Sequence, residues 1–282
     1  MALCAVFCHA QTGTADAIQK VQNVKTGILL VHYGTGNDHS RAATIDKLNA
    51  MVADRFADCN VLEAYAAPTV IRALAKRGIR KLTISQALDS LRSLGCTKIA
   101  VQSTMLLDGV MTDMLQRDVN RAKGAFQSVK VGRPLLYSVD DCRTLADMID
   151  RNLAADKRFD ATKSQVVLVG HGSDSPANAM YSQIDYLLKD EGRTLWHVGT
   201  IEGYPTIEAV ERQLAKSKVK SIILVPLLYI AGNHQKEDID GKWTQQLKEK
   251  GYNVSSLGKG LGEMPQVQQM ILDRIAALLG EK

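Results

Sequence analysis

Three residues whose side chains can bind metals or transfer protons occupy similar settings in the second half of the sequence. His171 lies in the string Gly-His-Gly-Ser, Glu202 begins Glu-Gly-Tyr-Pro, and His234 ends Ala-Gly-Asn-His. Two imidazoles and one carboxylate form a recognised ligand set for a divalent transition metal. Their separations of 31 and 32 residues are too long for a local metal motif. Only a fold that gathers three loops could therefore assemble them.

Each of these residues also has a structural interpretation. A single histidine after an apolar strand is more often structural than a ligand. Glu202 suits the start of a helix, since an acidic residue favours a helix N-terminus and Pro205 fits the first turn. His234 precedes a segment rich in charged residues, where it could be a surface cap. The metal hypothesis depends on the three residues occurring together.

The surrounding sequence is typical of an α/β protein. Apolar runs of strand length alternate with segments of helical periodicity, which indicates parallel strands joined by crossover helices. We expect strands at 27–31, 60–65, 98–103, 129–136, 165–169, 196–201, 221–228 and 252–256. Segments with apolar residues at helical spacing include 69–76, 86–94, 141–153 and 206–216.

The two halves of the chain resemble each other. The apolar run ending at His32 corresponds to the run ending at His171, and Glu-Ala-Tyr from Glu63 corresponds to Glu-Gly-Tyr from Glu202, each 139 positions later. A third correspondence joins 106–109 to 229–232. These matches predict a duplication that produced two similar Rossmann-like, flavodoxin-like domains with parallel sheets, facing each other across a cleft.

The candidate residues fall where such a fold binds ligands. Open parallel sheets bind ligands beyond the carboxyl ends of their strands. We expect His32 and His171 to end the first strand of each half, and Glu63 and Glu202 to end the second. The loop with His234 follows the third strand of the second half. Two facing lobes would bring these loops to one interdomain cleft, a common place for a large ligand.

Several strings in the second half resemble one known family. They are Gly-His-Gly-Ser at 170–173, Glu-Gly-Tyr-Pro at 202–205, Val-Pro-Leu-Leu at 225–228 with Ala-Gly-Asn-His at 231–234, and Gly-Leu-Gly-Glu at 260–263 with Pro265. Together they resemble the anaerobic sirohydrochlorin cobaltochelatases of the CbiK type, which are class II tetrapyrrole chelatases. The similarity extends from about Gly27 to the C-terminal helix.

The resemblance implies a site, a reaction and a domain plan. It implies that His171, Glu202 and His234 hold Co2+ or Fe2+, and that Tyr204 contacts a tetrapyrrole. The expected reaction inserts the ion into the macrocycle or removes iron from it, while an imidazole near its ordinary pKa transfers pyrrole protons. The lobes would comprise 25–138 with 264–282, and 139–263, with the helix 265–279 returning to the first lobe.

The chain departs from the family pattern in the first lobe. After the third strand the family usually has a histidine followed by an acidic residue, whereas this chain has Met105 and Met111. Core packing explains methionine well. The alternative is a thioether wall for haem, because methionine also serves as an axial haem ligand. His32 stands where the family usually has a small residue, and this imidazole, followed by Tyr33, would face the cleft.

These departures keep a second function open, namely an exported haem-binding protein for iron acquisition that uses the cleft without turnover. The first ten residues are mainly small and apolar and end in a small-x-small pattern, so we expect residues 1–24 to contain a signal peptide and the protein to reach the periplasm or outer surface. A receptor for another small anion would share the two-lobed plan.

Composition excludes several other classes. The chain has 282 residues and a net charge of +5, but no long basic block interleaved with aromatic residues, so nucleic acid is not an expected partner. No apolar run after the N-terminus is long enough for a membrane span. Cys59, Cys96 and Cys142 show no metal-binding spacing and read as free thiols. A homo-oligomer is compatible with the sequence.

Overall fold

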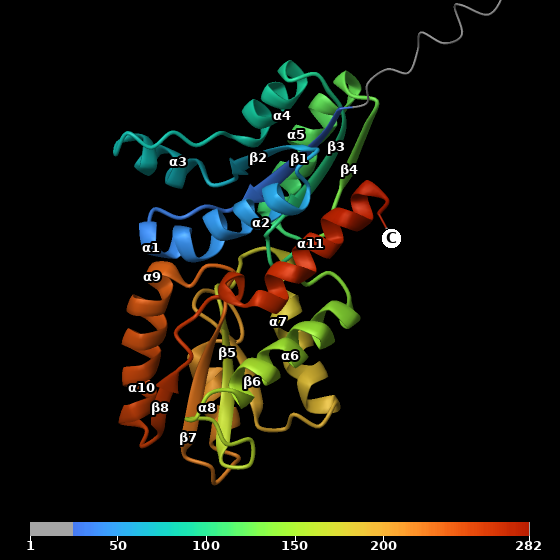
Figure 1. Cartoon of the computed structure of the whole chain (residues 1–282). Coiled ribbons are helices and arrows are strands. Elements are labelled where there is room, and N and C mark those ends of the chain that lie inside the picture. The colour runs from blue at the N-terminus through green and yellow to red at the C-terminus, as the bar shows by residue number, and fades with distance from the viewer. Residues whose placement is uncertain (1–24, 282) are drawn as a thin grey trace, which may run out of the picture.

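Two parallel sheets organise the computed structural model, which describes residues 25–281 (Figure 1). The first has the strand order β2-β1-β3-β4 and the second β6-β5-β7-β8. The strands are β1 (Lys25–His32), β2 (Asn60–Tyr65), β3 (Cys96–Ser103), β4 (Ser128–Val131), β5 (Ser164–Gly170), β6 (Trp196–Thr200), β7 (Ser221–Leu227) and β8 (Asn253–Ser256). The prediction of a two-sheet α/β fold is confirmed.

All eight expected strands are present, and one ends several residues earlier than expected. β4 ends at Val131, whereas the sequence suggested a strand to 136. Pro134 lies in the missing part and has no N–H to donate to a ladder. The central strands are apolar along their length because helices cover both faces of a parallel sheet. Every residue of β5 is buried.

Helices cover both faces of each sheet. They are α1 (Asp38–Arg41), α2 (Lys47–Arg55), α3 (Pro68–Ala75), α4 (Ile84–Ser93), α5 (Val110–Ala122), α6 (Val139–Ala154), α7 (Ala179–Asp190), α8 (Ile207–Leu214), α9 (Gly232–His234), α10 (Thr244–Glu249) and α11 (Pro265–Leu279). Two π-helical segments, η1 (Ala42–Asp46) and η4 (Gln235–Trp243), continue α1 and α9. In β1, Ile28 packs in the cluster that includes α2 and α11, whereas Leu29 packs with α4 and α5.

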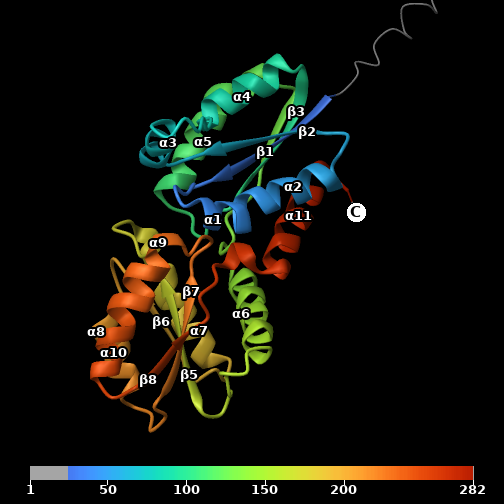
Figure 2. The same ribbon diagram turned by 60° about the vertical axis from the view of Figure 1, so that its left-hand side comes forward.

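The last helix returns to the first sheet, as the family resemblance implied. α11 lies beside α2 in both views (Figures 1 and 2) and packs against β3. Its Ile271 and Ile275 are fully buried in the same cluster as Ile28. The Lys130 ammonium on β4 donates a hydrogen bond to the Leu278 carbonyl at 2.8 Å. The exact boundaries of the two lobes stay a prediction.

The two lobes share one hydrophobic core. A single buried cluster contains Ile28 and Leu30 of the first sheet together with Val166 and Leu168 of the second, and α6 and α11 lie between them. Burying this apolar surface contributes roughly 25 cal/mol per Å². The common core fixes the orientation of one lobe relative to the other.

Strand register corrects the predicted repeat. The apolar runs of β1 and β5 align Gly27 with Val166. In the first sheet Gly27 is paired with Asn60, and in the second Val166 is paired with Trp196. The second strands of the two halves are therefore 136 positions apart, from Asn60 to Trp196. The motif comparison assumed 139 positions, which is three too many.

The match between Glu63 and Glu202 is wrong for this reason. With the observed register, the counterpart of Glu202 is Ala66. Glu63 lies inside β2, paired with Leu30, whereas Glu202 lies in the loop after β6. The correspondence of His32 with His171 is unaffected by this shift. The duplication therefore preserved the sheet plan but not the position of the acidic residue.

The expected signal segment, including Cys4 and Cys8, lies outside the described residues. Within residues 25–281 no helix is long and apolar enough to cross a membrane. Cys59, Cys96 and Cys142 are free thiols, as predicted.

A partly buried ion pair joins α11 to the first turn of α6 and predicts a stability effect. Arg274 donates to Asp141 at 2.7 Å and to the Pro134 carbonyl at 2.7 Å, and its side chain is 15% exposed. We expect Arg274→Ala to lower the free energy of unfolding by about 2 kcal/mol, because the buried Asp141 carboxylate loses its nearest charged donor and keeps only the half-exposed Arg133, at 3.2 Å, as an ion-pair partner. Urea denaturation measures this change.

The neighbouring residue supplies the control. Asp273 is 61% exposed, accepts a hydrogen bond from Gln269 at 2.8 Å and forms a 3.6 Å ion pair with Arg55. Its replacement by alanine should cost less than about 1 kcal/mol, as exposed pairs usually do. Equal losses for the two variants would contradict the importance assigned to Arg274.

Candidate metal-binding site

The loops after β5 and β6 are joined through their backbones. His171 follows β5 directly, and its carbonyl accepts a hydrogen bond from the Glu202 N–H at 2.7 Å. Gly172 has a φ of +91°, and a Cβ built on it would lie 1.2 Å from the Glu202 carbonyl oxygen. Only glycine permits this approach. Glycine at position 172 is therefore required by the contact between the two loops.

A single amide side chain connects the same two loops a second time. The Asn178 side-chain oxygen accepts from the Ser173 N–H at 3.0 Å, and its amide nitrogen donates to the Tyr204 carbonyl at 2.6 Å. Gly203, between Glu202 and Tyr204, has a φ of +106°. The backbone positions of His171 and Glu202 are thus fixed relative to each other.

The imidazoles of His171 and His234 lie next to each other. Their ring centroids are 4.8 Å apart and the rings are nearly perpendicular, at 89°. The Nδ1 of His171 is 3.1 Å from the Gly172 carbonyl oxygen. A carbonyl can only accept a hydrogen bond, so Nδ1 bears a proton, and in the neutral ring the lone pair is on Nε2. The neutral His171 ring can therefore bind a metal through Nε2.

His234 is held in the same way by a carboxylate. It ends α9, and its Nδ1 is 2.8 Å from an oxygen of Asp238, one turn along η4. The second Asp238 oxygen accepts from Lys242 at 2.9 Å. Although burial alone would raise the pKa of Asp238, the hydrogen bonds from His234 and Lys242 lower it below its ordinary value. Asp238 thus accepts the Nδ1 proton of His234.

The structure does not bring the Glu202 carboxylate into this pair. Its backbone contacts His171, but its side chain is exposed. In the part of the chain from 25 to 281, no group of three or more His, Cys, Asp or Glu side chains is arranged to hold a metal ion. Two of the three predicted ligands therefore meet, and the third is adjacent through the backbone only.

The pair lies close to the junction of the lobes. Gly109, just before α5 in the first lobe, approaches the loop that follows His171. A Cβ built on Gly109 would be 3.4 Å from the Cβ of Ala177 and 3.6 Å from the Ser175 hydroxyl. A ligand at the histidines would therefore have part of the first lobe nearby.

The expectation that His32 faces a ligand is wrong. Its side chain is fully buried, with Nδ1 3.0 Å from the Thr104 hydroxyl and Nε2 3.1 Å from the Asn49 side-chain oxygen. Asn49 in turn donates to Glu63, which is also paired with Lys81. Burial lowers the pKa of His32 to about 4 despite the opposing effects of Asn49 and Glu63. Both ring nitrogens are used inside the first lobe.

The methionines also pack in the first lobe instead of forming a thioether wall. Met105 is 7% exposed and belongs to the cluster of β1, β3, α4 and α5, and Met111 packs against the same cluster. The core-packing interpretation is correct for Met105. Tyr33 and Tyr204 differ, because their side chains are 50% and 58% exposed after β1 and β6. They remain available to an external ligand.

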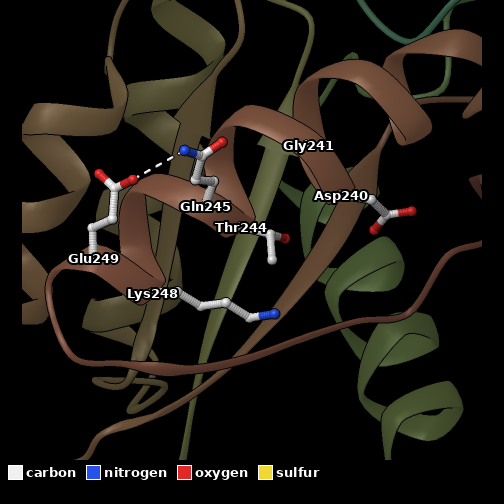
Figure 3. Close-up of a pocket in the computed structure, with 6 residues that line it drawn as sticks. All are labelled: Asp240, Gly241, Thr244, Gln245, Lys248 and Glu249. Carbon is white, nitrogen blue, oxygen red and sulfur yellow. Dashed lines mark hydrogen bonds between the residues drawn. The ribbon is translucent and has the colours of Figure 1, made fainter.

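Two surface pockets lie elsewhere. One is on η4 and α10, lined by Asp240, Gly241, Thr244, Gln245, Lys248 and Glu249 (Figure 3). The other is on α6 and α11, lined by Thr144, Met148, Pro265, Gln266, Gln269, Met270, Asp273, Arg274 and Ala277. Neither includes the histidine pair.

Sequence reasoning missed two residues of the site, Asn178 and Asp238. Asp238 had a readable signal, since it follows His234 by four residues on a segment expected to be helical, and such residues share a helix face. Asn178 had none, because its partners belong to two different loops.

Comparison with known proteins identifies the family. The family model described as cobalt chelatase (CbiK) matches residues 26–279. The chain belongs to the cobalt chelatase (CbiK) family. The match extends through both sheets and α11, so it covers the histidine pair and the shared core alike.

Two curated relatives align with this chain over most of their length and most of its own. It is 28% identical over 274 residues to the sirohydrochlorin cobaltochelatase CbiKC of Nitratidesulfovibrio vulgaris, covering 94% of this chain and 95% of the relative. It is 27% identical over 254 residues to the sirohydrochlorin cobaltochelatase of Salmonella typhimurium, covering 88% and 94%.

Solved structures support the fold. The structure of SirB from Bacillus subtilis with Fe3+ is similar with a TM-score of 0.64 at 18% identity, covering 90% of this chain and 96% of that one. The structure of CbiX, described as the terminal enzyme for siroheme biosynthesis in denitrifying bacteria, gives 0.58 at 20% identity, covering 89% and 98%. The fold is that of the class II chelatases.

The contact at Gly172 predicts a loss of metal binding in Gly172→Ala. The added methyl group would collide with the Glu202 carbonyl and separate the two loops. We expect the affinity for Co2+, measured by calorimetry, to fall at least tenfold. Gly192→Ala is a matched control, since Gly192 has a φ of +87° and no atom within 4 Å of a built Cβ. It should cost only about 1–2 kcal/mol of stability and leave Co2+ affinity unchanged.

The buried His32 predicts a pH-dependent stability. Its pKa is about 4 in the folded protein and about 6.5 when unfolded. Between these values the unfolded chain binds a proton that the folded protein does not, so stability falls as the pH is lowered from 6.5 to 4. His32 alone contributes about 3 kcal/mol to this loss.

Urea denaturation at pH 7 and pH 4.5 tests this effect. His197 is also buried, and burial lowers its pKa to about 4, so part of the pH dependence should persist in His32→Gln. We expect the difference between the two pH values to be clearly smaller in His32→Gln than in the unmodified protein. An unchanged difference would mean that His32 is not held neutral by the fold.

Proposed function

We propose that the protein is a tetrapyrrole metal chelatase that inserts Co2+ or Fe2+ into sirohydrochlorin, with the ion as a substrate held by His171, His234 and Glu202. The proposal is supported by family membership and by two full-length relatives that are named sirohydrochlorin cobaltochelatases. Metal is recorded in related structures, since SirB structures from Bacillus carry Fe3+ or cobalt.

The single structural observation behind the proposal is the orientation of the two imidazoles. Both donate from Nδ1, His171 to a backbone carbonyl and His234 to a carboxylate, and their centroids are 4.8 Å apart. Metal-binding histidines in proteins usually donate their other N–H in this way. Each ring therefore keeps Nε2 for a metal, and a rotation of the exposed Glu202 side chain would supply an anionic third ligand.

Insertion exchanges one ion for two protons. The macrocycle loses both pyrrole N–H protons as its nitrogens take the ion from the protein ligands. A set of two imidazoles and one carboxylate is open on one side, so the ring nitrogens can replace the protein donors one at a time. Each imidazole that releases the ion regains a lone pair at Nε2 and can accept a pyrrole proton there. Solvent then takes the protons from the exposed face of the site.

The exposed aromatic residues suggest how the ring is held. Tyr33 follows β1 in the first lobe, and Tyr204 follows β6 in the second, two residues after Glu202. Aromatic faces of this kind pack well against a flat conjugated ring. We assign both tyrosines to the macrocycle site.

The alternative of haem carriage without turnover loses the support of its site residues. It depended on His32, Met105 and Met111 facing the ligand and on export; these side chains pack in the first lobe, and the expected signal segment lies outside the described residues. The metal-binding pair that remains belongs to the chelatase hypothesis. Tetrapyrrole binding is common to both functions, so the presence of tyrosines does not favour haem.

Metal insertion tests the proposed function directly. Purified protein is incubated with sirohydrochlorin and Co2+ while visible spectra are recorded, and we expect the spectrum of the metallated product to develop. His171→Ala and His234→Ala should each reduce the rate at least 100-fold, because each removes a ligand. Glu202→Gln should reduce it less, since the amide oxygen is a weaker but possible donor.

An exposed histidine provides the control. His39 lies on α1 outside the histidine pair, and His39→Ala should retain the full rate. A rate in His171→Ala equal to that of the unmodified protein would remove His171 from the mechanism. A spectral change with haem but none with sirohydrochlorin and Co2+ would replace chelation by haem binding.

A further inference from the structure

The continuous helix formed by α9 and η4 places the buried carboxylate of Asp238 against His234. His234, Asp238 and Lys242 are spaced by four residues along the continuous helix formed by α9 and η4, and residues four apart share one helix face. Asp238 bonds His234 through one carboxylate oxygen and Lys242 through the other, at 2.8 and 2.9 Å. The three side chains thus form one hydrogen-bonded row.

Exposure decreases from the lysine to the aspartate within this row. The Lys242 side chain is 78% exposed, that of His234 is 40% exposed, and that of Asp238 only 11%. Because the Lys242 side chain is largely exposed to solvent, its ion pair contributes little. The contact between Asp238 and His234 is more enclosed and fixes the ring, since a carboxylate without a proton can only accept at Nδ1.

We propose that Asp238 is a positioning residue for metal insertion, which holds the His234 imidazole with its proton on Nδ1, beside the ring of His171. This inference rests on the proposed function. Without Asp238 the ring could rotate and exchange tautomers, and ion binding would have to select one state from several. Removing a hydrogen-bond partner of this kind typically lowers metal affinity 10–100-fold.

The π-helical geometry of η4 gives the row its context. Asp238 is the fourth of the nine residues of η4, which follows His234 directly. π-helical turns are rare and frequently occur at functional sites. The Gln235 amide donates to Asp240 and to Ser256 of β8, at 2.8 and 2.7 Å, and so ties the first turn of η4 to the second sheet. The helix start that holds His234 and Asp238 is therefore anchored to the second lobe.

The histidine tautomer can be measured in the metal-free protein. Nitrogen-15 NMR of labelled protein distinguishes a protonated Nδ1 from a protonated Nε2. We expect His234 to show the Nδ1–H form in the unmodified protein, and a mixture of tautomers in Asp238→Ala. Asp238→Asn should remain close to the unmodified protein, because its amide oxygen can still accept from Nδ1. A His234 signal unchanged in Asp238→Ala would overturn the positioning role.

Metal affinity and turnover supply the second readout. Calorimetric titration with Co2+ alone should show a 10–100-fold weaker Kd for Asp238→Ala, and insertion into sirohydrochlorin should fall by a similar factor, with the effect on KM for Co2+ exceeding that on kcat. Thermal unfolding near that of the unmodified protein establishes that the fold is intact. Co2+ binding by Asp238→Ala within twofold of the unmodified protein would also overturn the inference.

Two neighbouring residues provide matched controls. Glu237 precedes Asp238 on the same helix and is exposed, so Glu237→Ala removes the same charge without the contact to His234. Lys242→Met removes the far end of the row. Both should bind Co2+ within about twofold of the unmodified protein. An equal loss of affinity in Glu237→Ala and Asp238→Ala would show that net charge, and not the contact with His234, causes the effect.

The proposed function and this inference can fail separately. If the unmodified protein shows the Nδ1–H form of His234 but binds no Co2+ and metallates no sirohydrochlorin, the proposed function fails while the contact with Asp238 stands. If it metallates sirohydrochlorin and Asp238→Ala does so equally well, the function stands and the inference fails.

Discussion

The site depends on one hydrogen bond between two loops, from the Glu202 N–H to the His171 carbonyl. This bond requires the loop after β5 to touch the loop after β6 so closely that no side chain fits at Gly172. The turn at Gly172 also brings its carbonyl to the Nδ1 of His171. The backbone conformation at Gly172 therefore has three consequences. It brings the two loops into contact, it leaves no room for a side chain at 172, and it holds the proton of His171 on Nδ1.

The shared core extends this constraint from one lobe to the whole molecule. The cluster that buries Ile28 also buries Val166, and α11 closes it after the chain has completed the second sheet. A two-lobed protein whose lobes had separate cores would be free to open and close about a linker. Here relative motion of the lobes would have to disturb packed apolar surface. Entry of a large ring is therefore easier through movement of the strand-end loops than through separation of the lobes.

Sequence predicted the architecture better than the site. Eight strands, the histidines after β5 and β7, and the final helix follow from apolar periodicity and from glycine and proline positions, which are local properties of the chain. Register is not local, because it depends on how neighbouring strands pair, and the mistaken match of Glu63 with Glu202 reflects this. The partners of Asn178 could not be predicted for the same reason. Asp238 could have been predicted, since helical spacing alone places it beside His234.

The different surroundings of the two equivalent histidines explain why we assign the proposed metal chemistry to one half only. His32 and His171 end corresponding strands, yet His32 is fully buried and donates from Nε2 to Asn49, while its Nδ1 faces the Thr104 hydroxyl. Its lone pair is thus used inside the protein, and burial disfavours its charged form. His171 is partly exposed and donates from Nδ1 to the backbone, which leaves Nε2 directed to external partners. Two histidines at corresponding strand ends therefore differ in the hydrogen bonds of their rings. Both ring nitrogens of His32 have protein partners, whereas in His171 the protein partner is at Nδ1. A tautomer set by the fold, rather than the presence of histidine, is what distinguishes the two lobes.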